Sequence, residues 1–443
     1  MNRFIENYKD LAITEERKKL LQLIEIGLRE IKPEGLLKKA LKIRKGKLYI
    51  QNKAFDLSLF KKIIVLGIGK GSTLASTALA EILGKRLTGG IALDTVQYQE
   101  VRPPKIKDNV RRSNFPKLEF LVGTHPLTSR KNVKATQKII RLIKNLKKDN
   151  LLITFICGGG SALLCGSQKE FKNSILATKS LTQSGASILE LNTVRKHFSL
   201  VKGGGLAKIA YPATVINLIF SDVPGNDISM VASGPTVFDK TTKKDARKIL
   251  QKYNLSTSDV DRLRETPKDK KYFEKVYNFL VSSNKNVLEE LKNKAEALGF
   301  KARIYKDNLE GEAQKVGKIL LSKVRKRELI LAGGETTVKL KGKPFEKPQG
   351  KGGRNQELVL GALKYLKEGE MIISIASDGW DNTEAAGAIG DQETLKKAKK
   401  LNLDIGDYLN NHDSFRFFKK TGDLIFTGHT GINVSDLMLV YRK

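Results

Sequence analysis

The sequence predicts an α/β protein with two α/β domains and mainly parallel sheets, of which the N-terminal sheet is doubly wound. Short apolar runs such as 62–66, 152–156 and 371–376 alternate with amphipathic stretches of helical periodicity such as 131–146. Strand and helix in alternation favour parallel sheets, because a crossover must carry the chain back before each new parallel strand. The chain has 443 residues, 40% of them hydrophobic. A chain of this length usually forms more than one hydrophobic core, so we expect two domains.

The boundary between the two domains is expected near residue 240. The stretch 238–275 is polar, charged and poor in strand signals, and we interpret it as a helical connector. The predicted domains are therefore residues 1–240 and residues 241–443.

Composition excludes several classes of protein. Two cysteines, Cys157 and Cys165, cannot form a disulfide scaffold or a cysteine metal cluster in a chain of this length. The N-terminal run carries acids and no apolar core, so we expect no secretory signal and a cytoplasmic protein. The longest uncharged run, 151–168, is interrupted by glycines, and we expect no membrane span.

The formal net charge of +34 allows a nucleic-acid-binding protein as one alternative. The basic residues are spread along both halves, mostly as lysine on helix-like stretches such as 394–400. Aromatic residues make up 7% of the chain and do not alternate with the basic residues as a base-stacking surface requires. We interpret the charge as solvated helix faces and expect no specific nucleic-acid partner.

Small and polar residues gather where the predicted strands end. Seven strands run directly into turns rich in Gly, Ser, Thr or Asp, at 67–72, 123–126, 157–163, 221–229, 333–337, 377–382 and 427–433. Open α/β sheets bind ligands at the carboxyl ends of their strands, where loops and helix N-termini converge. The pattern predicts one or two sites for anions.

The first of these turns, GIGKGS, allows two interpretations. Gly67 and Gly69 permit a tight turn into a helix, and the run is close to a dinucleotide-binding fingerprint, with Asp94 placed where a ribose-binding acid would stand. Lys70 favours another interpretation, since a cation at a helix N-terminus is unfavourable unless an anion binds with it. Lysine there suits a transferring phosphoryl group or a substrate carboxylate.

Two glycine triplets, 158–160 and 203–205, are candidates for binding a polyphosphate. Successive glycines expose backbone amides, and a following serine can donate to a phosphate oxygen. Their residues, with the Asn192 and Glu335 of neighbouring motifs, complete the predicted nucleotide-binding set: Gly67, Gly69, Gly158, Gly159, Gly160, Ser161, Asn192, Lys202, Gly203, Gly204, Gly205 and Glu335.

Acidic turns offer carboxylates for Mg²⁺, which needs only one or two of them when it arrives with a nucleotide. Asp222 and Asp227 lie in one such turn and are the predicted metal ligands, while Asp378 and Asp381 lie in another. Arg354 follows a glycine-rich run and precedes a helix, where a guanidinium could clamp a carboxylate or a γ-phosphoryl group.

Taken in order, these motifs resemble the class II glycerate kinases, the glycerate 2-kinase family with a C-terminal MOFRL domain. The resemblance covers nearly the whole chain, and LNTVRKHFSLVKGGGLA and GKGGRNQEL are its most specific runs. It implies a Rossmann-like N-terminal domain, a MOFRL region at about 327–440 and an active site in the cleft between the domains. It also implies transfer of the γ-phosphoryl group of ATP, with Mg²⁺, to the 2-hydroxyl of D-glycerate. The family's catalytic lysine and arginine fall on Lys70 and Arg354.

The chain departs from the family's pattern in its last loops. His429 and Ile432 stand where proline and threonine are usual, Asn382 replaces a glycine, and Glu384 replaces an aspartate. Beside the kinase, an NAD(P)-dependent hydroxypyruvate reductase stays open as the alternative, supported by the near-fingerprint and Asp94. The expected partners are ATP and D-glycerate, with a homodimer as a candidate assembly.

Overall fold

The computed structural model describes residues 3–95, 117–221, 223, 225, 227–255, 263–339, 351–431 and 434–443. The chain divides into two compact units. One contains Pro33–Glu100 and Lys107–Ser282 and is called here the N-terminal unit; the other contains Met1–Lys32 and Ser283–Lys443 and is called the C-terminal unit.

The N-terminal unit is built on a six-stranded sheet with the order β6-β5-β4-β7-β8-β9. Strands β4 to β8 pair in parallel, as the alternating pattern predicts. Their bounds are β4 (Lys62–Ile68), β5 (Gly89–Asp94), β6 (Leu118–Val122), β7 (Asn150–Ile156), β8 (Thr214–Ser221) and β9 (Val276–Ser283). Central strands β7 and β8 are buried along their whole length, which explains their unbroken apolar composition.

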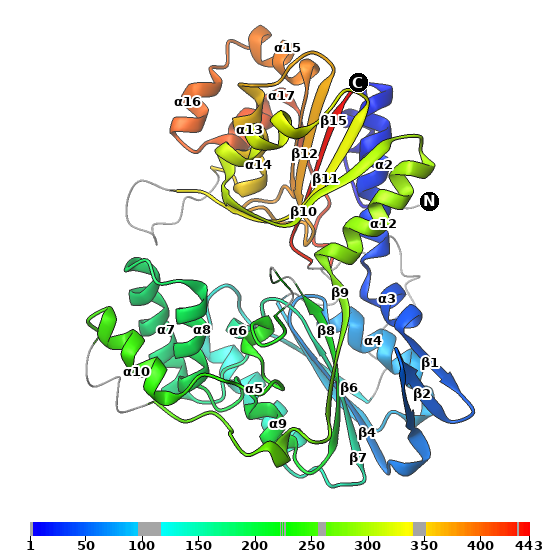
Figure 1. Cartoon of the computed structure of the whole chain (residues 1–443), viewed down its shortest axis with the longest axis vertical. Coiled ribbons are helices and arrows are strands. Elements are labelled where there is room, and N and C mark those ends of the chain that lie inside the picture. The colour runs from blue at the N-terminus through cyan, green and yellow to red at the C-terminus, as the bar shows by residue number, and fades with distance from the viewer. Residues whose placement is uncertain are drawn as a thin grey trace. The chain divides into compact units, whose positions relative to one another are not determined.

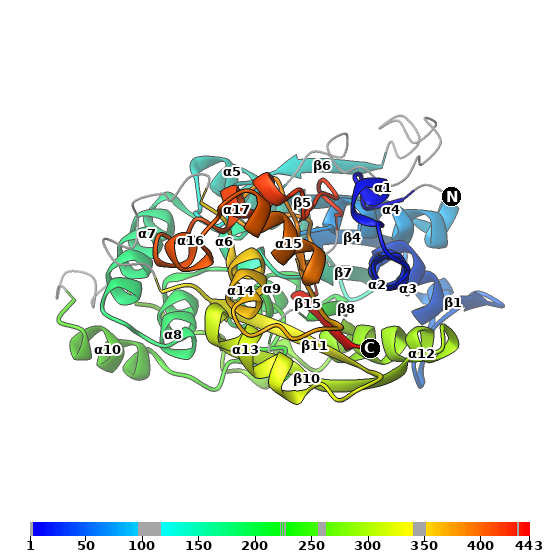
Figure 2. The same cartoon turned by 90° about the horizontal axis from the view of Figure 1, so that it is seen from above.

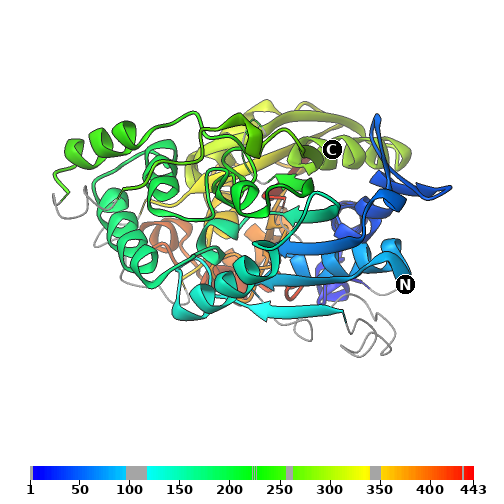
Figure 3. The same cartoon turned by 90° about the horizontal axis from the view of Figure 1, so that it is seen from below.

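Helices cover both faces of this sheet (Figure 1). Apolar residues of α3 (Pro33–Ala40) and α4 (Ser72–Leu83) pack on one face, and those of α5 (Arg130–Ile143) and α9 (Gly205–Ala210) pack on the other. The view from below shows a separate group of helices beyond the sheet (Figure 3), formed by α7 (Gln168–Gln183), α8 (Ile188–Phe198) and α10 (Lys243–Lys252) around their own small core.

An antiparallel sheet of three short strands, β1 (Leu41–Arg44), β2 (Lys47–Ile50) and β3 (Lys53–Asp56), precedes the main sheet and was not expected from the sequence. Its strands are only four residues long and rich in lysine, so the apolar alternation is too short to stand out.

The C-terminal unit contains a mixed six-stranded sheet with the order β10-β11-β15-β12-β13-β14. Only β10 and β11 pair in parallel, and the other pairs are antiparallel. The strands are β10 (Lys301–Glu312), β11 (Glu328–Thr337), β12 (Glu370–Ala376), β13 (Gly387–Gly390), β14 (Leu424–Ile425) and β15 (Asp436–Arg442).

This sheet also has helices on both faces (Figure 2). Helices α2 (Glu15–Glu30) and α12 (Asn284–Ala297) pack on one face, and a second core joins the other face to the helices α13 (Ala313–Lys323), α14 (Arg354–Leu363), α15 (Gln392–Lys400), α16 (Ile405–Asn410) and α17 (Ser414–Thr421). Buried Arg17 ties α2 to this unit through Asp391 at 2.6 Å and Asp423 at 2.8 Å.

The predicted boundary at residue 240 differs from this division. After 240 the chain returns to the N-terminal sheet as β9, and the amide of Val215 donates to the carbonyl of Lys275 at 2.9 Å. The polar stretch 238–275 is thus part of the N-terminal unit, and the helix α2 near the N-terminus belongs to the other unit because its apolar face completes that core.

No helix among the residues described is long and apolar enough to cross a membrane.

Candidate active site

The sheet order places a ligand-binding crevice between β4 and β7. From β4 the chain adds β5 and β6 on one side and then crosses back to add β7 and β8 on the other side. In doubly wound sheets the loops diverge at such a point and leave a crevice at the carboxyl ends of the strands. The loops that follow β4 and β7 are the two sequence motifs GIGKGS and CGGGSAL.

These two loops are bound to each other. The amide of Lys70 donates to the carbonyl of Gly158 at 2.9 Å. Gly69 has a φ of +115°, and a Cβ there would stand 2.5 Å from the carbonyl oxygen of Cys157. Gly67 is also required for packing, since its Cβ would collide with Ser76 Oγ. We conclude that Gly69 serves the close approach of the two loops and that Gly67 serves the packing of β4 against α4.

The first glycine triplet, Gly158–Gly160, faces Lys70. Gly159 has a φ of +82°, and a Cβ there would lie 3.4 Å from both Lys70 Cγ and His125 Cδ2. Within the described part of the chain, the amides of Gly158, Gly159 and Ser161 donate to no backbone or side-chain acceptor. Adjacent unpaired amides of this kind form an anion-binding concavity, as the sequence predicts for this loop.

A chain of side-chain hydrogen bonds supports this loop. Ser161 Oγ lies 2.8 Å from Ser233 Oγ, which donates to Asn192 Oδ1 at 2.9 Å. Ser233 has a φ of +60°, and its neighbour Ala232 has a φ of +52°. Two consecutive non-glycine residues in the left-handed region are strained, and such strain is concentrated at functional sites. The predicted residue Asn192 therefore reaches the loop through Ser233.

Asp94 does not have the ribose-binding position that the dinucleotide interpretation requires. Its side chain is fully buried and accepts the amides of Thr73 at 2.9 Å and Gly71 at 3.3 Å. It therefore caps α4 from the neighbouring strand, and the N-terminus of that helix is already bound to a carboxylate. Burial raises the pKa of Asp94, and the amide hydrogen bonds oppose that shift.

The second glycine triplet does not form an anion site, contrary to the prediction. The amides of Gly203, Gly204 and Gly205 donate to the carbonyls of Ser233, Gly234 and Lys202 at 2.8–3.0 Å. Because these amides already have acceptors, the triplet has a structural role: it lets its own turn pack closely against residues 233–235.

Lys202 is likewise a structural residue rather than a phosphate ligand. Its ammonium is buried, donates to the Leu164 carbonyl at 2.6 Å and pairs with Glu170 Oε1 at 3.1 Å. A buried ion pair of this kind leaves little for a ligand to bind.

Of the two predicted metal ligands, the structure describes Asp227 alone. Asp222 lies outside the described residues, and Asp227 is exposed and accepts the amide of Ser229 at 2.9 Å. No group of three or more His, Cys, Asp or Glu side chains with the spacing of a metal site occurs among the residues placed by the structure.

In the C-terminal unit, Arg354 begins α14 and is held by two acids. Its Nε and Nη2 donate to the two carboxylate oxygens of Asp436 at 2.5 and 3.0 Å, and Nη2 also meets Glu335 Oε1 at 3.0 Å. The third nitrogen, Nη1, has no partner in the described ranges. The guanidinium is thus fixed along one edge and has one nitrogen to offer, while the predicted ligand Glu335 is one of its supports.

Two buried carboxyl groups surround this arginine. Asp381 accepts the amides of Asn355 at 3.1 Å and Gln356 at 2.9 Å and so caps α14. Burial, together with the charge of Asp436, raises the pKa of Asp381 to about 6. Burial raises the pKa of Asp436 to about 6 as well, although Arg354 opposes the shift. For Arg354, burial lowers the pKa, but the carboxylates more than offset burial and raise it.

Asp436 and Ser233 are the residues of these sites that sequence analysis missed. Asp436 begins the last strand and Ser233 lies in the run MVASGP; both stand in runs that resemble the family, but sequence analysis assigned neither side chain a role. Their roles arise from contacts with residues 82 and 72 positions away.

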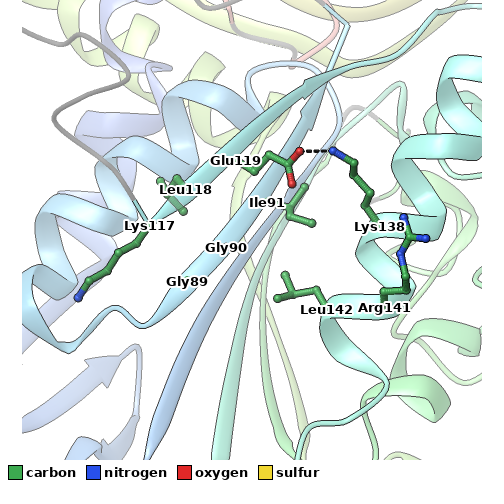
Figure 4. Close-up of a pocket in the computed structure, with 9 residues that line it drawn as sticks. All are labelled: Gly89, Gly90, Ile91, Lys117, Leu118, Glu119, Lys138, Arg141 and Leu142. Carbon is green, nitrogen blue, oxygen red and sulfur yellow. Dashed lines mark hydrogen bonds and ion pairs between the residues drawn. The ribbon is translucent and has the colours of Figure 1, made fainter.

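A wider hollow lies away from these loops. A cavity of about 560 Å³ lies between the amino-terminal ends of β5 and β6 and helix α5 (Figure 4). Its lysines are already bound, Lys138 to Glu119 and Lys117 to the Leu87 carbonyl. Because it lies at the opposite edge of the sheet from the glycine loops, it is not a candidate active site.

Two family models match the chain. Residues 19–266 match the model described as "Domain of unknown function (DUF4147)", and residues 328–436 match the MOFRL family.

Proteins of similar sequence align with most of the chain. A D-glycerate 2-kinase of Thermotoga maritima is 35% identical and aligns with 92% of this chain and 98% of its own length. A crystal structure of a glycerate kinase from the same organism superposes with a TM-score of 0.79 at 32% identity, over 96% of this chain and 99% of that one. A putative hydroxypyruvate reductase of Agrobacterium vitis is 37% identical over 73% of this chain and 77% of its own length.

Proposed function

The chain belongs to the class II glycerate kinase family, and from this premise we propose that it transfers the γ-phosphoryl group of ATP to the 2-hydroxyl of D-glycerate. The observation that carries the proposal is the crevice loop Gly158–Ser161, whose unpaired amides lie beside Lys70.

The first triplet and Lys70 suit a phosphate group. Unpaired backbone amides can donate hydrogen bonds to phosphate oxygens without a steric clash. The side chain of Lys70 lies next to these amides and adds a positive charge. We assign the phosphates of ATP to this loop, with Lys70 stabilising charge on the transferring group. The positive φ of Gly159 keeps side-chain atoms away from this surface.

Arg354 is the second catalytic residue that we propose. The bidentate hydrogen bonds to Asp436 fix the plane of its guanidinium. Nη1 is therefore already oriented before a ligand binds, and the side chain loses little conformational entropy when the reaction takes place. A pre-oriented cation of this kind stabilises charge that develops in a transition state. Asp436 is a positioning residue in this proposal.

Mg²⁺ is part of the proposal as the usual companion of ATP. A nucleotide-bound ion needs one or two protein carboxylates, and Asp227, which is exposed in its turn, is the described one of the two predicted ligands. When bound, the ion would neutralise phosphate charge. The roles of Lys70, Arg354 and the amide loop do not depend on its position.

The reductase alternative has less support. It needs an acid to bind a ribose, yet Asp94 is buried and bound to the amides of its own unit. It would also leave Lys70, beside the unpaired amides, without a role.

Two assays run side by side test the proposal. ADP release is measured with ATP, Mg²⁺ and D-glycerate, and NADH oxidation is measured with hydroxypyruvate. The product is identified by phosphorus NMR, because a 2-phosphate couples to one carbon-bound proton and a 3-phosphate couples to two. Formation of ADP and 2-phosphoglycerate supports the proposal, whereas NADH oxidation without ADP release would replace it with the reductase.

A further inference from the structure

A small cavity lies between residues 161–162 at the end of the first triplet loop, the turn 126–128 and the helices α7 and α8. It has a volume of about 30 Å³, and its polar lining comes from Thr128, Ser161, Ser174, Thr178, Arg195 and Lys202. Ser161 is thus shared between this cavity and the proposed phosphate loop.

Arg195 is a partly buried cation in this cavity without a balancing acid. Its Nε makes one long contact of 3.4 Å with Thr178 Oγ1, and it forms no ion pair with any described residue. The other cation of the lining, Lys202, is already neutralised by Glu170. Burial lowers the pKa of Arg195, and no neighbouring carboxylate opposes this effect. A guanidinium in such a place costs free energy unless an anion joins it.

A second lining group also lacks a partner. The hydroxyl of Ser174 is buried and makes no hydrogen bond. Buried hydroxyls are nearly always bonded, so an unbonded one beside an unpaired cation indicates a site that a ligand completes. The hydroxyls of Ser174 and Thr178 are both donors available to an anion.

The size of the cavity limits the anion. A volume of about 30 Å³ suits a small group such as a carboxylate better than a triphosphate or a nucleobase. A guanidinium binds a carboxylate through two parallel hydrogen bonds.

We infer that this cavity binds the carboxylate of the acceptor acid and that Arg195 is the residue that selects acids over neutral alcohols. The inference rests on the proposed function, because it places the acceptor next to Ser161 and the phosphate loop. It assigns Arg195 to binding of the acceptor and leaves ATP to the amides and Lys70.

The test compares Arg195→Gln and Arg195→Lys with a control, Arg141→Gln, an exposed arginine of α5 that forms no ion pair with a described residue. We expect Arg195→Gln to raise KM for D-glycerate roughly 10- to 100-fold, the range for loss of charged hydrogen bonds, with KM for ATP changed less than about twofold. Arg195→Lys should recover only part of the loss, because an ammonium cannot bind both oxygens in one plane. The control should match the parent protein.

Melting temperatures separate binding from a structural role. Without D-glycerate, Arg195→Gln should melt at the same temperature as the parent protein or higher, because it removes an unbalanced charge. Added D-glycerate should raise the melting temperature of the parent protein and not of the variant. A lower melting temperature without ligand, a raised KM for ATP, or an unchanged KM for D-glycerate would each overturn the inference.

Calorimetric measurement of D-glycerate binding distinguishes a failure of the carboxylate site from a failure of the proposed kinase function. If the parent protein releases no ADP but binds D-glycerate in a way that Arg195→Gln abolishes, the kinase proposal fails and the carboxylate site stands. If the parent protein binds no D-glycerate, the carboxylate site is wrong.

Discussion

The backbone amide of Lys70 donates a hydrogen bond to the carbonyl of Gly158 at 2.9 Å. This contact joins the loops that follow β4 and β7, and it sets the lysine beside the unpaired amides of the first triplet. The carbonyl of Gly158 points into the joint between the loops, so the amides of the same turn are left for a ligand. The proposed phosphate site therefore depends on the pairing of two strands.

Replacement of Lys70 by alanine should lower kcat on the order of 10²- to 10³-fold and change KM less, because the ammonium acts on charge that grows during transfer. Lys62→Ala is the matched control, since Lys62 is exposed at the opposite end of the same strand. Steady-state kinetics of ADP release measure both. Kinase turnover that survives Lys70→Ala would contradict the mechanism.

The two glycine triplets should respond differently to the same substitution. Gly159 and Gly204 have nearly equal φ values, +82° and +83°, so alanine introduces similar backbone strain at each. At Gly159 the new methyl group faces Lys70 and His125, and we expect a raised KM for ATP. At Gly204 it meets Phe273 at 2.6 Å, and we expect a lowered melting temperature. An unchanged KM for ATP in Gly159→Ala would remove the first triplet from the site.

Asp436→Asn should reveal how far Arg354 depends on its support. The ionised Asp436 holds the guanidinium, and its pKa is about 6, so kcat should fall as the pH drops below about 6. The variant should have a lower kcat at neutral pH and should lose this acidic limb. A pH profile of kcat for both proteins measures the effect. Arg354→Lys is a further variant, which keeps the positive charge but cannot form the bidentate hydrogen bonds to Asp436. An acidic limb that persists in Asp436→Asn would assign it to another group.

Stability should show the opposite pH dependence at these carboxyl groups. Asp381 and Asp436 have folded-state pKa values of about 6, above the ordinary value of about 4 for an unfolded chain. The folded protein therefore binds more protons between these values, and their contribution to the free energy of unfolding falls as the pH rises from about 4 to about 6. Urea denaturation at several pH values measures the effect in the parent protein and in the double variant Asp381→Asn/Asp436→Asn. The difference between their free energies of unfolding should vary with pH over that window alone.

Asp94→Ala should destabilise the N-terminal unit. The change removes the carboxylate that accepts the amides of Gly71 and Thr73, and loss of a buried cap costs about 1–3 kcal/mol. Asp56→Ala, which removes an exposed cap, should have a much smaller effect on urea denaturation. A stable Asp94→Ala protein that loses an NADH-dependent activity would restore the ribose-binding interpretation.

The α/β class of the fold and the loops of the proposed site can both be predicted from the order of residues. Alternating apolar and amphipathic runs predicted an α/β fold with mainly parallel sheets, which holds for the N-terminal sheet but not for the C-terminal one, where β10 and β11 form the parallel pair and the other pairs are antiparallel. Glycine-rich turns at the carboxyl ends of the strands predicted the crevice, because that signal is local in the chain. The motifs of Lys70 and Arg354 were also readable, since each lies in a run of distinctive residues.

Which of the two glycine loops keeps its amides open to an anion depends on long-range packing. Gly158–Gly160 and Gly203–Gly205 look alike in the sequence, yet the second triplet donates its amides within its own unit and the first keeps amides at Gly158 and Gly159 unpaired. In the same way, the boundary expected at residue 240 gave way to a strand that rejoins its sheet. Whether an amide or a charge is free depends on what packs against it, and that partner lies far away in the chain.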